Sequence, residues 1–192
     1  MRKSLFVLGT MLATMWSSLA SAGLVNGNFD TGDFTGWSVA GDGIGIDTTF
    51  PNLPCCDAAF SALSTDPNIG VLSQSIATTP GSGVTIKFQL LDEAGSFGNT
   101  FTVTFGTFSQ DITGDLAAFA YTPFSLSVPA ADITDISTLL SFQGTNDQAA
   151  WNLDDVSVSP AAIPEPASLG IFGVALLGMF SSRRRVRRNS VI

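Results

Sequence analysis

The sequence contains no histidine, and only 12% of its 192 residues are charged, about half the usual share in globular proteins. Without histidine the chain has no Ser-His or Cys-His nucleophile pair, no histidine-zinc site and no imidazole base. Arginine is missing from residues 4–182, so this stretch also lacks the guanidinium group that clamps phosphate or carboxylate. These absences exclude many of the common hydrolase and phosphate-binding sites.

Positive charge is confined almost entirely to the two ends of the chain. Residues 23–162 contain 15 acidic residues and a single base, Lys87, which gives this region a net charge of −14. Such a surface repels the phosphate backbone of DNA and RNA, so we expect no nucleic-acid partner.

Residues 1–22 have the three parts of a secretory signal peptide. Arg2 and Lys3 precede an apolar stretch at 5–19, and the small residues Ala20-Ser21-Ala22 follow. The apolar stretch is shorter than the roughly 20 residues of a membrane-spanning helix and leads directly into a cleavage site. We therefore expect signal peptidase to cleave after Ala22.

The C-terminal end combines the tripeptide Pro164-Glu165-Pro166, an apolar segment at 167–180 and an arginine-rich block at 183–188. As a helix the apolar segment would extend about 21 Å, less than the roughly 30 Å hydrocarbon core, so it predicts a marginal and temporary membrane span. The arginines would remain cytoplasmic and hold the acidic region outside.

This tail resembles the PEP-CTERM sorting signal of Gram-negative bacteria, which an exosortase-type membrane protease reads. The resemblance implies that Pro164, Glu165 and Pro166 form the sorting motif. It also implies an exported protein that is transiently anchored in the inner membrane, through the sorting helix alone, before delivery to the cell surface or extracellular matrix. We accordingly expect three parts: a signal peptide (1–22), a folded domain (23–160) and a sorting signal (161–192).

The central region alternates apolar and polar residues, which is the pattern of β-strands. About ten short strands, separated by turn residues at roughly 8- to 12-residue spacing, predict an all-β domain, either a sandwich or a barrel. The predicted strands are 24–29, 37–40, 43–47, 59–63, 71–76, 84–91, 101–105, 108–112, 121–128, 139–144 and 151–158.

The alternation in the last predicted strand changes phase at Asp154-Asp155. If the strand alternated regularly, Trp151 and Leu153 would lie on one face, and Val156 and Val158 would lie on the other. This change predicts a β-bulge or a ligand site at the two aspartates.

The opening residues 24–30, the dipeptide Gly36-Trp37 and the closing residues 153–158 resemble the jelly-roll β-sandwich of galactose-binding-like and carbohydrate-binding modules. The resemblance implies this fold and an extracellular polysaccharide as a partner. It also implies a structural Ca²⁺ held by the Asp30 carboxylate, the Asn28 carbonyl and the Asp154 carboxylate. Asp30 stands where the related modules have glutamate, so its carboxylate reaches less far.

Three aromatic residues, Trp37, Tyr121 and Trp151, are candidates for stacking on a sugar ring. Core packing is the favoured role of the two tryptophans, because each lies in a predicted strand among apolar neighbours. The two cysteines, Cys55 and Cys56, are adjacent, and an exported protein permits their oxidation. A vicinal disulfide, an intermolecular bridge and a free thiol pair all remain open.

The adjacent acid pairs Asp92-Glu93 and Asp154-Asp155 raise the alternative of a secreted glycoside-acting enzyme with two catalytic carboxylates. Sequence neighbours on a strand point to opposite faces, so neither pair is by itself a facing pair. We therefore expect a non-catalytic protein that binds glycan or has a structural role in the matrix.

Overall fold

The computed structural model describes residues 23–49, 52, 54–94, 99–113, 118–147 and 149–161. By its internal contacts the chain separates into two units, Met1–Pro160 and Ala161–Ile192. The predicted signal peptide, the Pro164-Glu165-Pro166 tripeptide and the sorting helix lie outside the described residues. Among the residues that are described, no helix is long and apolar enough to cross a membrane.

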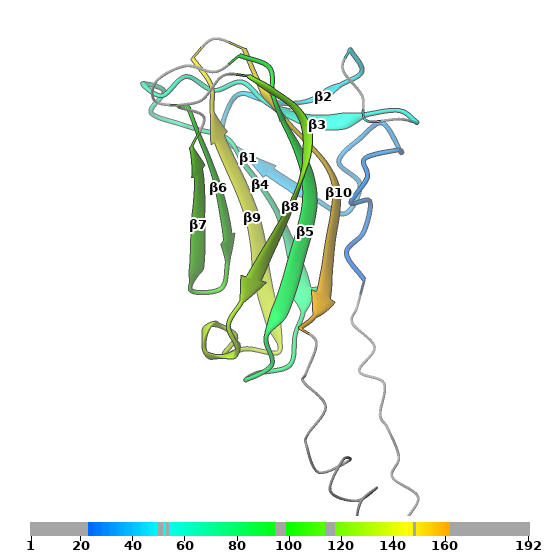
Figure 1. Cartoon of the computed structure of the whole chain (residues 1–192), viewed down its shortest axis with the longest axis vertical. Coiled ribbons are helices and arrows are strands. Elements are labelled where there is room, and N and C mark those ends of the chain that lie inside the picture. Colours follow the sequence, from blue (N-terminus) through cyan, green and yellow to red (C-terminus); the bar gives the residue numbers. More distant parts are fainter. Residues whose placement is uncertain are drawn as a thin grey trace, which may run out of the picture. The chain divides into compact units, whose positions relative to one another are not determined.

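Ten strands in the described residues form two antiparallel, five-stranded sheets (Figure 1). Sheet 1 contains, in spatial order, β1 (Ser38–Ala40), β4 (Val71–Ala77), β9 (Ser137–Thr145), β6 (Thr100–Phe105) and β7 (Phe108–Thr113). Sheet 2 contains, in spatial order, β2 (Ile44–Asp47), β3 (Asp57–Phe60), β10 (Trp151–Pro160), β5 (Val84–Asp92) and β8 (Phe119–Val128). A short 3₁₀ helix, η1 (Ala130–Asp132), lies between β8 and β9.

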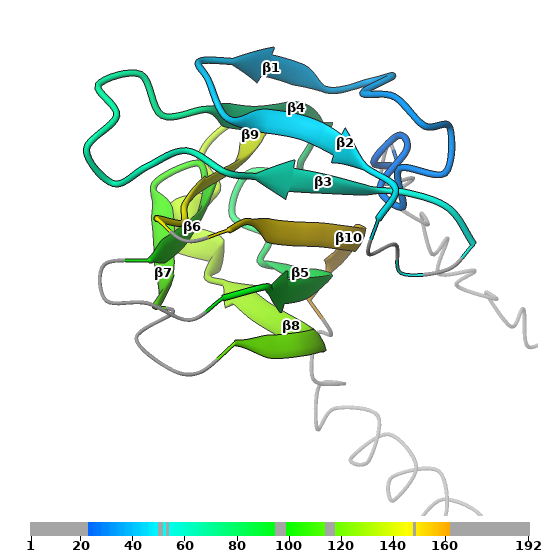
Figure 2. The same cartoon turned by 90° about the horizontal axis from the view of Figure 1, so that it is seen from above.

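Most neighbouring strands are not consecutive in the sequence, so the chain crosses repeatedly from one sheet to the other (Figure 2). β4 of sheet 1 is followed by β5 of sheet 2, and β9 is followed by β10 in the same way. The two sheets enclose one hydrophobic core. The domain is therefore the jelly-roll β-sandwich that the sequence predicts.

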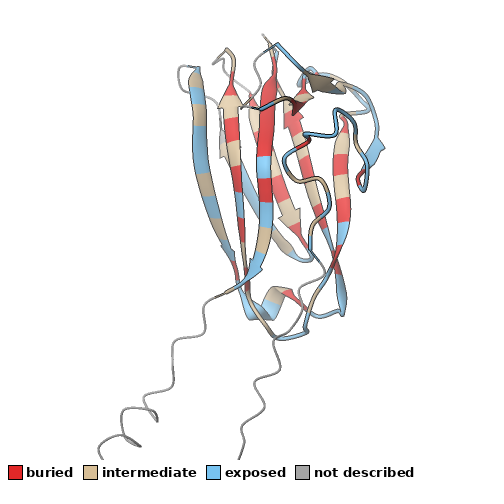
Figure 3. Ribbon diagram, turned by 90° about the vertical axis from the view of Figure 1, so that its right-hand side faces the viewer, coloured by how far each residue is buried: buried red, intermediate tan, exposed pale blue. Residues whose placement is uncertain are grey.

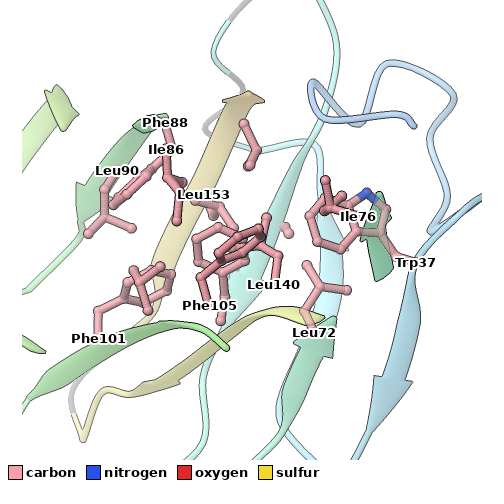
Figure 4. Packing of buried hydrophobic residues seen from close by; sticks show 14 of the residues in the cluster. Trp37, Leu72, Ile76, Ile86, Phe88, Leu90, Phe101, Phe105, Leu140 and Leu153 are labelled. Carbon is pink, nitrogen blue, oxygen red and sulfur yellow. The ribbon is translucent and has the colours of Figure 1, made fainter. Parts of the chain in front are cut away.

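The core results from the period-two pattern, since β4, β5, β6 and β9 each bury alternate residues (Figure 3). In β5 the buried side chains are Val84, Ile86, Phe88, Leu90 and Asp92. Phe88 meets Phe101 and Phe142 of sheet 1 at ring-centroid distances of 6.4 and 5.7 Å. Figure 4 shows Phe88 and Phe101 among the other buried side chains. Each such side chain contributes about 1.5–3 kcal/mol on burial, so this layer holds the sheets together.

The strand predicted at 24–29 is wrong, because this segment forms bends and a turn. In this segment, backbone N–H and carbonyl groups form hydrogen bonds with side chains and not with a neighbouring strand. Gln74 accepts a hydrogen bond from the Val25 N–H at 2.7 Å and donates one to the Val25 carbonyl at 3.0 Å. The Trp37 indole donates to the Asn26 carbonyl at 2.9 Å. The opening segment is thus anchored by residues that follow it in the sequence.

A β-bulge interrupts β10 where the change of phase predicts it. The register of β10 against β5 shifts between Asp154 and Ser157, and Asp155 has a φ of 50°. The extra residue turns Val156 toward the core, where it is 5% exposed. The Val156 N–H also donates to the Gly27 carbonyl at 2.8 Å, which attaches the opening segment to the closing strand.

Candidate functional site

The outer face of sheet 2 carries carboxylate, amide and phenol side chains. Because Ala58 and Leu153 point into the core, the residues next to them on β3 and β10 point outward. We call six residues on this face the acidic cluster. They are Asp47 on β2, Asp57 on β3, Asn152 and Asp154 on β10, Glu93 directly after β5, and Tyr121 on β8.

The strand order brings the acidic cluster together from distant parts of the chain. Asp47 pairs directly with Asp57, and the register of β3 with β10 puts Asp154 on the other side of Asp57. Tyr121 lies on β8, with β5 and β10 between it and β3, and its hydroxyl donates a hydrogen bond to Asp57 Oδ2. The Tyr121 side chain therefore passes over β5 and β10.

Three members of the acidic cluster are unusually buried for an outer face. Asp57 and Asn152 are 0% exposed and Asp154 is 2% exposed, although all three point away from the core. Asp47, Glu93 and Tyr121 are half-buried and form the accessible part of the cluster.

The cluster has more acceptor atoms than donors. The Asn152 side-chain amide donates to Glu93 Oε1 at 2.9 Å and to Asp47 Oδ2 at 3.5 Å. The Tyr121 hydroxyl donates its hydrogen bond to Asp57 Oδ2. Asp57 Oδ1 and Asn152 Oδ1 are buried and have no hydrogen-bond partner among the described residues. The described donors of the site therefore do not satisfy all of its buried acceptors.

Burial and mutual repulsion favour the neutral form of two of these carboxyl groups. Burial is the main cause that raises the pKa of Asp57 to about 6, and repulsion from Asp47 and Glu93 raises it further. The hydrogen bond from Tyr121 acts in the opposite direction and lowers this pKa. Burial also raises the pKa of Asp154 to about 7, with a lowering hydrogen bond from the Asp155 N–H and repulsion from the Asp155 and Asp57 carboxylates. Burial and contact with Asp57 raise the pKa of Tyr121, so its hydroxyl keeps its proton.

A pocket of about 280 Å³ lies where β5 ends and β8 begins, and we call it the β5–β8 pocket. It is lined by Leu91, Asp92, Glu93, Ala118, Phe119 and Ala120. Glu93 belongs to both the pocket and the acidic cluster. Asp92 is 1% exposed, its Oδ1 accepts a hydrogen bond from Asn146 at 2.9 Å, and its Oδ2 has no partner among the described residues. Burial raises the pKa of Asp92, against hydrogen bonds from Ala94 and Asn146.

Of the three aromatic residues considered for sugar stacking, only Tyr121 lies at this face. Trp151 is 0% exposed and donates its indole N–H to the Thr145 carbonyl at 2.8 Å. Trp37 is 8% exposed and packs on Phe142 at a centroid distance of 6.1 Å. Neither tryptophan presents a ring face to a ligand, and both have the core role that their apolar neighbours favour.

The sequence analysis missed Asp57, Asp47 and Asn152 as members of the site. The predicted strand starts at residue 59, whereas β3 begins at Asp57. Counting back by two from Ala59 would have placed Asp57 on the outer face. No local pattern connects Asp57 with Tyr121, which is 64 residues away.

Cys55 and Cys56, directly before β3, are bonded to each other in a vicinal disulfide. Cys56 is 2% exposed and Cys55 is half-buried. The bridge lies on the chain immediately before Asp57, so it constrains the approach of the chain to the acidic cluster.

Of the residues expected to bind calcium, Asn28 and Asp30 lie in the opening segment, whereas Asp154 lies on β10. The Asn28 side-chain amide donates to Asp30 Oδ2, and both residues are exposed. Asp154 belongs to the acidic cluster and accepts a hydrogen bond from the Asp155 N–H at 2.7 Å. Oxygen donors of this kind suit Ca²⁺. Within the described residues, no group of three or more cysteine, aspartate or glutamate side chains is arranged to hold a metal ion. Calcium binding by Asn28, Asp30 and Asp154 therefore stays a prediction.

In each of the two adjacent acid pairs, Asp92-Glu93 and Asp154-Asp155, the two residues differ in burial. Asp92 is buried on the core side of β5, and Glu93 is half-buried on the outer face. Asp154 is buried in the acidic cluster, whereas Asp155 is exposed at the bulge, where its Oδ2 accepts a hydrogen bond from Asn52 at 3.3 Å. The structure instead brings Asp154 beside Asp57, a pair that is distant in the sequence.

Comparison with protein families finds a PEP-CTERM protein-sorting motif at residues 162–185. The chain therefore carries this sorting motif, which supports export and sorting to the cell surface. No curated protein matches the chain significantly.

Solved structures with the same fold include carbohydrate-binding modules. TmCBM61, solved in complex with β-1,4-galactotriose, shares 15% identity at a TM-score of 0.52, over 71% of this chain and 97% of that chain. The CBM22-1 xylan-binding domain from Paenibacillus barcinonensis Xyn10C shares 17% identity at a TM-score of 0.50, over 76% of this chain and 98% of that chain. The K3 cleaved adhesin domain of Lys-gingipain from Porphyromonas gingivalis shares 18% identity at a TM-score of 0.51, over 72% and 98%. At these identities the similarity establishes the jelly-roll fold.

Proposed function

We propose that the protein is an exported, non-catalytic module that binds extracellular polysaccharide through the outer face of sheet 2. The observation that carries the proposal is the β5–β8 pocket, which shares Glu93 with the acidic cluster. The half-buried carboxyl groups of Asp47 and Glu93 can accept hydrogen bonds from sugar hydroxyl groups, and the half-buried Tyr121 ring offers an apolar surface to a sugar ring. The jelly-roll fold and the sorting motif support this assignment.

For the route to the surface, we propose cleavage by signal peptidase after Ala22, transient anchoring through residues 167–180, and processing by an exosortase-type protease near Pro164-Glu165-Pro166. The match of the sorting motif to 162–185 supports this route. Replacing the tripeptide with three alanines should leave the precursor membrane-bound and unprocessed, as measured by mass spectrometry of surface and membrane fractions. Release of the variant with the wild-type C-terminus would show that the tripeptide is only a linker.

A glycoside-acting enzyme is the second candidate function. The neighbouring carboxyl groups of Asp57 and Asp154 favour it, because both have raised pKa values of the kind that general acids need. Both carboxyl groups are almost fully buried, however, which favours a binding role over one that needs substrate and water between them. Release of reducing ends from a bound glycan, lost in Asp57→Asn, would support the enzyme.

A glycan array with the purified full chain tests the binding proposal. We expect binding to a limited set of glycans, and a loss of about fivefold or more in Glu93→Gln, since this variant removes an accessible acceptor charge. Asp111→Asn is the matched control, because Asp111 is exposed on the other sheet and its substitution removes the same charge. No binding to any glycan, or equal losses in the two variants, would contradict the proposal.

A further inference from the structure

The β5–β8 pocket is lined by two carboxyl groups that differ in how they are satisfied. Glu93 is half-buried and gives one oxygen to the Asn152 amide, so the rest of its carboxylate is available at the pocket wall. Asp92 is almost fully buried, and its Oδ2 has no hydrogen-bond donor among the described residues. The two carboxyl groups are the acidic part of the pocket lining, so the pocket is suited to a ligand group that donates hydrogen bonds.

The charges around the pocket have one sign. Asp47, Asp57 and Asp154 lie on the same outer face as Glu93, and their repulsion contributes to the raised pKa values of the two buried members. Lys87 is the only base in residues 23–162. It lies further along β5, opposite Ser157 and Ser125. The raised pKa values of Asp57 and Asp154 reduce the negative charge of these two groups near pH 6, but the acidic cluster contains no base, so its excess of acidic groups still favours a positively charged ligand group.

We propose that the β5–β8 pocket binds an ammonium group, so that the ligand is a polysaccharide of amino sugars with free amines. This inference rests on the proposed glycan-binding function and specifies its substrate class. An ammonium group has three N–H donors and no acceptor, which matches the Asp92 and Glu93 carboxyl groups, the two acidic residues of an otherwise apolar lining. A hydroxyl group brings one donor together with lone pairs, and an N-acetyl group adds a carbonyl acceptor, so both match the pocket less well.

Three oligosaccharides of equal length and β-1,4 linkage test the proposal: glucosamine hexamer, N-acetylglucosamine hexamer and cellohexaose. Calorimetric titration of the purified full chain at about pH 6, with chelator present, should show at least about tenfold tighter binding of the glucosamine hexamer. Glu93→Gln should weaken that binding about fivefold, and Asp92→Asn should also weaken it, with melting temperatures measured to show that both variants are folded. Asp111→Asn on sheet 1 should bind like the wild type.

Equal or tighter binding of either uncharged hexamer would overturn the ammonium inference and leave the proposed function intact. Equal weakening by Asp111→Asn and Glu93→Gln would also overturn it, because the attraction would then come from the overall charge of the domain. Binding that requires added Ca²⁺ would show that the acceptors hold a metal ion. Binding to none of the three hexamers would overturn it too, and a negative array of other glycans would remove the proposed function as well.

Discussion

The two outer faces of the sandwich are built from the same alternating strands, but they carry different chemistry. On sheet 1, strand pairing places Ser73, Ser141, Thr104 and Ser109 side by side in one row. Asp111 is the one acidic residue in the described strands of this sheet. On sheet 2 the outer face carries the acidic cluster. The hydroxyl groups of sheet 1 can satisfy one another, as Ser75 and Ser137 do at 2.7 Å, whereas the carboxylates of sheet 2 cannot.

The contrast supports the proposal that the outer face of sheet 2 binds the ligand and that the outer face of sheet 1 is structural. A hydroxyl group is both donor and acceptor, so a row of serine and threonine side chains forms a self-sufficient surface. An ionised carboxylate is an acceptor only, so neighbouring carboxylates need donors from elsewhere. Among the described residues, the unsatisfied buried acceptors on the outer faces are Asp57 Oδ1 and Asn152 Oδ1, and both belong to sheet 2.

We expect the largest effect on stability from substitutions that compare the core side of β10 with its outer side. Trp151→Ala should lower the free energy of unfolding by about 3–5 kcal/mol, because it leaves a cavity in the core. Asn152→Ala, one residue further on and facing outward, should cost about 1 kcal/mol, for the loss of its hydrogen bonds to Glu93 and Asp47. Urea unfolding of both variants measures the difference. Equal losses would contradict the assignment of the two residues to opposite faces.

The second prediction concerns the dependence of stability on pH, which we expect to come from the buried carboxyl groups of sheet 2. Asp57 and Asp154 bind a proton more tightly in the folded state, with pKa values of about 6 and about 7 against 3.8 in the unfolded chain. The folded state therefore holds more protons between about pH 4 and pH 7, and the free energy of unfolding should fall across this range as pH rises. We expect a total fall on the order of 3 kcal/mol for this coupled pair.

Urea titrations from pH 4 to about pH 8 measure this slope. Asp57→Asn should flatten it, and Asp111→Asn should leave it unchanged. The lowered pKa values of Asp33 and Asp147, which hydrogen bonds from Thr31 and Ser64 produce, act with the opposite sign, but only below about pH 4. Stability that rises from pH 4 to about pH 7 would contradict the burial of the two carboxyl groups.

Much of the fold could be predicted from the sequence, because it depends on local alternation. The bulge at Asp154-Asp155 was predicted for the same reason, since a change of phase is visible within one strand. The acidic cluster could not be predicted, because it depends on strand order. Asp57 meets Tyr121 only because β10 and β5 lie between their strands, and no pattern within either strand encodes that arrangement. The anchoring of residues 24–29 by Gln74, 49 residues from Val25, was missed for the same reason.

A further prediction concerns calcium and the attachment of the opening segment to sheet 2. We propose that an ion bound by Asn28, Asp30 and Asp154 reinforces the Gly27–Val156 hydrogen bond. Binding to the native state alone would stabilise it by about 2.7 kcal/mol at a hundredfold excess over Kd. Thermal unfolding in millimolar calcium and in chelator measures this shift, which Asp30→Ala and Asp154→Ala should abolish. Identical midpoints in the two buffers would rule the ion out.

The smallest expected effect concerns the vicinal disulfide, which has no counterpart in sheet 1. A bridge between neighbouring residues closes almost no loop, so Cys55→Ser with Cys56→Ser should cost well under the roughly 2–4 kcal/mol typical of longer loops. Asp57 follows Cys56 directly in the chain, so loss of the bridge should change mainly how the stability depends on pH. At about pH 4, where the carboxyl groups of Asp57 and Asp154 are both protonated, we expect a smaller change in the melting temperature. Calorimetry of the double variant at the two ends of that pH range provides the test. A dimer of the wild-type protein that disappears in the variant would instead show that the cysteines pair between molecules.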